Sequence, residues 1–157
     1  MSQVLDYHRV FVSIAAYRDP QLNAAIADCL RKAHNPEQLR FGIYWQHAAE
    51  DLPPAYAGDD RFQILDILWQ DSRGACWARA EAMKLWRGEE WFLQVDSHCR
   101  FAAGWDERLI RMMGETGSPK PVLSTYATPF TPDRRRSLKE PRYKWLSRVL
   151  LPTSSLT

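Results

Sequence analysis

Short apolar runs and amphipathic segments alternate along most of the chain. The apolar runs are bounded by charged or polar residues and predict buried strands over residues 10–16, 41–45, 62–69 and 91–95. Apolar residues at positions i, i+3 and i+4 predict helices over residues 22–33, 75–87 and 105–113. A fifth strand is expected over residues 122–127. Asp19 followed by Pro20 predicts the N-cap and the first residue of the first helix.

The order of these elements predicts an α/β fold with an open, mostly parallel sheet and flanking helices. Ligands of such sheets bind beyond the carboxyl ends of the strands, so residues that directly follow strands are the first candidates for function. These residues are Tyr17, Arg18, Asp19, Gln46, His47, Asp96, Ser97 and His98. The chain has neither a GxGxxG nor a GxxxxGK[ST] phosphate loop, which excludes the common dinucleotide-binding and P-loop classes.

Composition places the chain among single-domain globular proteins. It has 157 residues, of which 45% are hydrophobic and 25% charged. No run approaches the ~20 apolar residues of a membrane span, and the N-terminus lacks the apolar core of a secretion signal. The 3 cysteines are widely spaced and odd in number, so they build neither a disulfide framework nor a zinc pair. We therefore expect a cytoplasmic protein with no membrane span.

The charge of the chain changes sign near residue 132. Residues before this point are net acidic, whereas residues 133–157 are net basic. Apolar residues in this tail have the spacing of a basic amphipathic helix. Such a helix binds a membrane surface or nucleic acid, or it covers a sheet edge with its cations in solvent. We favour the last alternative and expect no nucleic-acid partner.

Asp96 and His98 form the motif with the clearest chemistry. They lie two residues apart at the end of a hydrophobic strand, where both side chains can point into one cleft. A carboxylate oxygen and an imidazole nitrogen suit Mn²⁺ or a similar divalent ion, with phosphate oxygens and water as further ligands. The alternative is a structural one, in which Asp96 caps a turn and His98 makes a hydrogen bond.

The surroundings of this motif resemble metal-dependent glycosyltransferases with the GT-A fold. The blocks VFVSIAAYRDPQL, RGACWAR, LQVDSHCRFAAGWD and VLSTYATPF are similar, in the same order, to those of one cytoplasmic family. That family transfers N-acetylglucosamine from UDP-GlcNAc to a hydroxyproline of a ubiquitin-ligase adaptor. The Asp-Ser-His-Cys strand end also resembles the polypeptide N-acetylgalactosaminyltransferases. The resemblance covers residues 9–132 and identifies them as a nucleotide-sugar-binding domain of the GT-A type.

The resemblance implies an enzyme that moves a sugar from a UDP-sugar donor to a hydroxyl of a protein or glycan, with retention of configuration. Asp96 and His98 match the ligands of a divalent ion, Mn²⁺ or Mg²⁺, that bridges the pyrophosphate. Ser97 would approach the ribose or the donor sugar. Arg73 matches an arginine lying over the diphosphate, with an exposed arginine at a helix start as its alternative. No catalytic base or nucleophile is assigned.

Further donor-binding residues are expected on the first strand and on the helix after Arg73. Arg79 would reach the donor or pair with a carboxylate such as Asp96, and in either case lie buried near the site. The first strand would cradle the uracil through Ser13, Ala15 and Tyr17. Core packing is the alternative for Tyr17. Arg18 would contact the nucleotide-sugar or form an ion pair with Asp19 that fixes the first helix.

The chain departs from the family pattern after His98. The family completes its metal site with a downstream histidine, and no histidine follows His98 here. Residues 133–157 do not resemble the family, so the chain corresponds to a donor-binding half, truncated before most of the acceptor-binding half. It is then a shortened gene product, a chain completed by a partner polypeptide, or a nucleotide-binding domain that transfers no sugar. A catalytically silent fragment or interaction module is therefore the alternative to the transferase.

Overall fold

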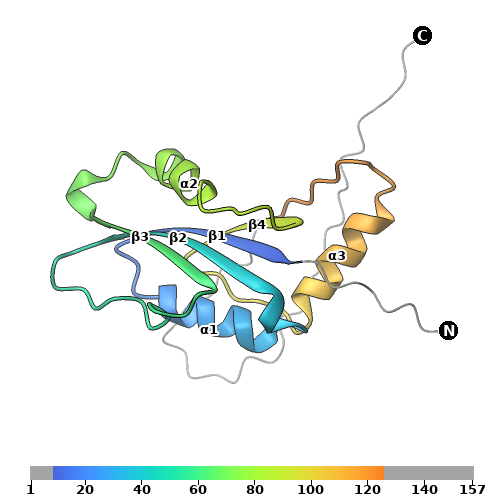
Figure 1. The fold of residues 1–157 in the computed structure, drawn as a ribbon, viewed down its shortest axis with the longest axis horizontal. Coiled ribbons are helices and arrows are strands. Elements are labelled where there is room, and N and C mark those ends of the chain that lie inside the picture. Colours follow the sequence, from blue (N-terminus) through green and yellow to red (C-terminus); the bar gives the residue numbers. More distant parts are fainter. Residues whose placement is uncertain (1–8, 126–157) are drawn as a thin grey trace, which may run out of the picture. The chain divides into compact units, whose positions relative to one another are not determined.

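Four parallel strands form the sheet in the computed structural model, which describes residues 9–125. They are β1 (Val10–Tyr17), β2 (Leu39–His47), β3 (Phe62–Leu68) and β4 (Trp91–Asp96). Figure 1 shows them in the order β3-β2-β1-β4. β1 pairs with β2 along its whole length and with β4 as far as Ala15, opposite Asp96. The α/β fold with an open parallel sheet is therefore confirmed.

The two faces of the sheet are covered by different helices. Figure 1 shows α1 (Leu22–Lys32) on one face and α2 (Ala75–Met83) on the other. The apolar stripe of α1, predicted from its periodicity, is buried. On the opposite face, Ala78 and Ala82 of α2 pack against Tyr44 of β2. β1 and β2 are therefore covered on both faces, which explains why their sequences are continuously apolar.

β4 is less buried than its sequence predicts. It pairs only with β1 among the described strands, and its residues alternate between half-buried and exposed. The side chain of Phe92, for example, is 40% exposed. The prediction of a buried strand is wrong here, because the WFLQV run lies at the edge of the sheet formed by the described strands rather than between two neighbours.

Two helix boundaries also differ from the sequence prediction. α1 begins at Leu22 with Gln21 as its N-cap, so Asp19 is not the cap and Pro20 is not the first helical residue. Instead, Asp19 Oδ1 accepts a hydrogen bond from the main-chain N–H of Gln21 at 2.8 Å, which closes a turn before the helix. α2 ends at Met83 rather than at residue 87, and turn-type hydrogen bonds follow it.

The remaining elements are short or lie near the end of the described chain. Two 3-10 helices, η1 (Pro36–Gln38) and η2 (Trp69–Asp71), precede β2 and follow β3. α3 (Trp105–Glu115) spans the point after Glu107 at which the chain divides into two units. Residues 122–125 contain no strand, contrary to the sequence prediction; residues 126 and 127, and the basic tail, lie outside the described residues. No helix between residues 9 and 125 has the length and apolar character needed to cross a membrane.

Candidate functional site

The segments that follow β1 and β4 meet at the carboxyl edge of the sheet. Asp19 Oδ2 accepts a hydrogen bond from Ser97 Oγ at 2.5 Å and lies 2.9 Å from His98 Nδ1. The two segments are far apart in sequence but are brought together because β1 and β4 are neighbours. Ser97 is buried, and the side chain of Asp19 is only 14% exposed. The residues that follow Asp96 therefore contact a largely buried carboxylate.

The side chains expected to bind metal are open to solvent. Asp96, the last residue of β4, is 57% exposed at its side chain, and His98 is 61% exposed. Arg79 Nη2 of α2 donates to Asp96 Oδ1 at 3.0 Å. The expected pairing of Arg79 with this carboxylate is present, but its expected burial is wrong, because its side chain is 41% exposed. Asp96 is thus held by one exposed ion pair.

The donor chemistry of Asp96 and His98 is compatible with a divalent cation. His98 uses Nδ1 toward Asp19, so its Nε2 carries a lone pair whenever Nδ1 bears the proton. Within residues 9–125, no group of three or more His, Cys, Asp or Glu side chains is arranged to hold a metal ion. A cation at Asp96 and His98 would therefore take its other ligands from phosphate oxygens and water, as Mn²⁺ and Mg²⁺ do in nucleotide sites.

Asp19 is the site residue that sequence reasoning left outside the nucleotide-sugar and metal candidates. Burial by itself raises its pKa, but hydrogen bonds from Ser97, Gln21 and His98 outweigh this effect and hold the pKa below its ordinary value. Its position after β1 was a signal, yet the sequence offered only structural roles for it, as a helix N-cap or in an ion pair with Arg18. In the structure, the guanidinium of Arg18 instead lies over the ring of Trp69, 4.8 Å from its centroid.

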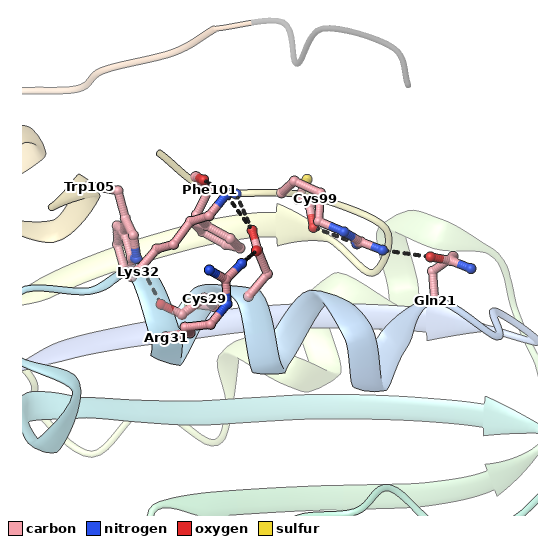
Figure 2. A network of polar contacts seen from close by, with 9 residues as sticks. Gln21, Cys29, Arg31, Lys32, Cys99, Phe101 and Trp105 are labelled. Carbon is pink, nitrogen blue, oxygen red and sulfur yellow. Dashed lines mark hydrogen bonds and ion pairs between the residues drawn. The ribbon is translucent and has the colours of Figure 1, made fainter. Parts of the chain in front are cut away.

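The segment after His98 is fastened to α1 by polar contacts, shown in Figure 2. The buried carboxylate of Asp28 accepts from the N–H of Phe101 at 2.8 Å, and Lys32 Nζ donates to the carbonyl of Phe101 at 2.6 Å. Trp105 Nε1 donates to the carbonyl of Cys29 at 3.0 Å. Trp105 is 5% exposed, so its ring packs in the interior.

Asp106 provides a second anchor for the same segment. Its side chain is buried, and its two oxygens accept from the main-chain N–H groups of His34 at 2.7 Å and Asn35 at 2.9 Å. These N–H groups belong to the segment that follows α1. Together with the contacts of Asp28, they fix the path of the chain that leaves the Asp96–His98 motif.

The residues expected to cradle the base occupy different surroundings. Ser13 is buried, and its hydroxyl has no hydrogen-bond partner in the described part of the chain. Ala15 lies opposite Asp96 on the neighbouring strand. Tyr17 is 51% exposed, so the alternative of core packing is wrong. Arg73 lies over the ring of Trp77, 5.5 Å from its centroid, and the donor roles of all these residues stay predictions.

A hollow of about 210 Å³ lies beside the end of β1. Its walls include Arg18, Asp19 and Trp45. His47, the last residue of β2, stacks on Trp45 of the same strand with ring centroids 3.8 Å apart. Its ring nitrogens lie 2.6 Å from the carbonyl of Ala48 and 2.5 Å from Asp66 Oδ1, so both are engaged within the protein.

Comparison with models of protein families gives a match over residues 9–60 and 57–149. The matching family is described as Glycosyltransferase (GlcNAc). These two segments cover most of the chain and continue past residue 132, where the resemblance read from the motifs ends. No curated protein matches the chain at a significant level.

Proposed function

The chain belongs to the Glycosyltransferase (GlcNAc) family, and from this premise we propose that it binds a UDP-sugar, UDP-GlcNAc first among them, together with Mn²⁺ or Mg²⁺. The observation that carries the proposal is the strand end of β4, where Asp96 and His98 are exposed to solvent and His98 contacts the largely buried Asp19. Carboxylate and imidazole donors at the carboxyl edge of a parallel sheet suit a cation–diphosphate pair.

The proposed roles follow from the contacts of each side chain. Asp96 and His98 would hold the cation, whose charge offsets the negative charge that builds up on the departing UDP. Arg79 is already beside Asp96, so its guanidinium can turn to a phosphate oxygen at the same place. Arg73 at the turn before α2 would contact the diphosphate. Ser13, Ala15, Tyr17 and Arg18 would contact the nucleoside, and Ser97 would keep the motif in register through Asp19.

We extend the proposal to the activity that the sequence motifs suggest. The domain would have the GT-A fold, act in the cytoplasm, and transfer the sugar to a hydroxyl of a protein or glycan with retention of configuration. The order of the four sequence blocks supports this assignment, as does their likeness to the enzymes that modify a hydroxyproline of a ubiquitin-ligase adaptor. A partner chain would supply acceptor-side groups if the chain acts as a donor-binding half.

Calorimetry with UDP, in the presence and absence of Mn²⁺, tests the donor proposal. We expect Mn²⁺ to strengthen UDP binding, and Asp96→Ala to reduce the Mn²⁺-dependent gain by at least about tenfold. Asp60→Ala is the matched control, because Asp60 is exposed and precedes β3 at the opposite edge of the sheet. UDP binding that does not depend on Mn²⁺, or that is equal in the Asp96 and Asp60 variants, would contradict the proposal.

The alternative of a nucleotide-binding module without transfer rests on the two-residue donor set of the described chain. It predicts the same Mn²⁺-dependent UDP binding but no release of UDP from UDP-GlcNAc. A coupled assay for free UDP, with and without hydroxyl acceptors, separates the two functions. UDP release that disappears in Asp96→Ala supports the transferase, whereas intact UDP-GlcNAc after long incubation supports the binding module.

A further inference from the structure

We propose that Asp19 is a positioning residue that sets the tautomer of His98 and so prepares its Nε2 to bind the cation. This inference rests on the proposed function, because it concerns the same strand end. Its basis is the contact of 2.9 Å between Asp19 Oδ2 and His98 Nδ1, across a large separation in sequence.

The surroundings of Asp19 make it a fixed group rather than a mobile one. Its Oδ1 accepts from the N–H of Gln21 at 2.8 Å, and its Oδ2 accepts from Ser97 Oγ at 2.5 Å. Its side chain is 14% exposed, whereas that of His98 is 61% exposed. A carboxylate that accepts hydrogen bonds at both oxygens therefore contacts an imidazole that is mostly exposed to solvent.

The chemistry of the contact dictates which nitrogen of His98 carries the proton. An ionised carboxylate is only a hydrogen-bond acceptor, so Nδ1 of His98 must be the donor toward Asp19. A neutral imidazole then has its lone pair on Nε2, which is the atom left for a cation. Carboxylate partners of this kind orient metal-binding histidines in general, and their loss typically lowers metal affinity about 10–100-fold.

Ser97 extends the effect of Asp19 to the backbone between the two ligands. Its hydroxyl donates to the same Oδ2 that His98 contacts, so one oxygen holds two successive residues of the motif. Ser97 is buried, which keeps this contact away from competing water. Asp19 therefore fixes both the imidazole and the chain that connects it to Asp96.

Asp19→Asn gives a sharp test because it preserves shape while changing hydrogen-bond direction. If the amide oxygen stays on Gln21, the amide NH₂ faces His98 and donates to Nδ1, which moves the imidazole proton to Nε2. An imidazole protonated at Nε2 offers no lone pair there for a cation. If the amide is turned over, the N–H of Gln21 faces another donor and loses its acceptor.

The tautomer is measured by ¹⁵N NMR of the histidine rings in the metal-free protein at about pH 8, where an ordinary imidazole is neutral. His98→Gln identifies the signal. We expect the Nδ1–H form in the wild type and a shift toward Nε2–H in Asp19→Asn. An Nε2–H form in the wild type overturns the inference without any variant, and circular dichroism checks that Asp19→Asn is folded.

Mn²⁺ affinity in the presence of UDP, followed by the electron paramagnetic resonance signal of free Mn²⁺, gives the second readout. We expect Asp19→Asn to weaken Mn²⁺ binding about 10–100-fold. Asp60→Asn, a change of the same kind at an exposed carboxylate, should leave it unchanged. Ser97→Ala should preserve the tautomer, since Asp19 still faces His98. Wild-type affinity in Asp19→Asn overturns the inference, whereas a wild type that binds no Mn²⁺ overturns the proposed function.

Discussion

The anchoring carboxylate of Asp106 allows a stability prediction to be worked from the structure. Asp106 is 1% exposed and accepts two main-chain hydrogen bonds, from His34 at 2.7 Å and Asn35 at 2.9 Å. Replacing it by Ala removes both acceptors and leaves a small cavity at the start of α3. The chain after the Asp96–His98 motif then loses one of its attachments to the segment that follows α1.

The size of the loss follows from the two hydrogen bonds. Hydrogen bonds to charged groups contribute about 1.5–3 kcal/mol each. His34 is exposed and Asn35 is half-buried, so water entering the cavity would replace part of this contribution. We therefore expect Asp106→Ala to lower the free energy of unfolding by about 2–4 kcal/mol. Asp106→Asn keeps one acceptor but turns an NH₂ group toward the other N–H, and should cost about 1.5–3 kcal/mol.

Urea unfolding, followed by tryptophan fluorescence and circular dichroism, measures these changes. Glu107→Ala is the control, because Glu107 is the next residue, is 46% exposed and lies 3.9 Å from His34 Nδ1. An exposed pair of this kind should contribute less than about 0.5 kcal/mol. A change below this value in Asp106→Ala, or wild-type stability in Asp106→Asn, would refute the reasoning that both N–H groups depend on the carboxylate.

Two further predictions concern packing and pH. Gly42→Ala should lower unfolding free energy by about 1–3 kcal/mol, because its Cβ would lie 2.2 Å from Phe11 Cζ. Gly114→Ala is its control: nothing lies within 4 Å, and thermal melting should show equal or higher stability. For His47, burial lowers the pKa, but hydrogen bonds to a main-chain carbonyl and Asp66 outweigh it, so the pKa is raised above 6.5. The stabilisation of the folded state by protonated His47 is complete below pH 6.5 and is lost as the pH rises through the raised pKa. The difference in unfolding free energy between wild type and His47→Gln should therefore shrink over that range. A difference that stays constant with pH contradicts this prediction.

The sheet could be predicted from the sequence because burial leaves a simple pattern. A strand covered on both faces needs an unbroken apolar run, and β1 has one from Val10 to Ala16. The end of α2 could not be predicted in this way, because Leu85 and Trp86 continue the helical spacing. Other contacts engage these residues: Gln63 Nε2 of β3 donates to the carbonyl of Leu85, and Trp86 Nε1 donates locally to the carbonyl of Glu89.

In the candidate site, too, the features that depend on nearby residues could be predicted from the sequence, and those that depend on tertiary structure could not. The spacing of Asp96 and His98 is local, so the sequence predicts this pair of side chains together. The contact of Asp19 with His98 depends on β1 lying beside β4, which strand order along the chain does not reveal. The exposure of Arg79 was also missed, because the sequence does not reveal that β4, whose Asp96 it contacts, lies at the edge of the described sheet.

Asp19 and Asp96, the two carboxylates at this sheet edge, differ in exposure and in the number of groups that they bind. This difference indicates separate roles, Asp19 as a fixed support and Asp96 as a ligand in the proposed site. The side chain of Asp19 is 14% exposed and accepts from three groups, so separating it from them would leave the buried hydroxyl of Ser97 unpaired. Asp96 is 57% exposed and held by one ion pair with Arg79. An exposed ion pair contributes only about 0–1 kcal/mol, so a cation can displace Arg79 from Asp96 at small cost. In the proposed site, the same exchange would free the guanidinium of Arg79 for a phosphate, and cation and diphosphate binding would then be coupled through one side chain while Asp19 stays in place.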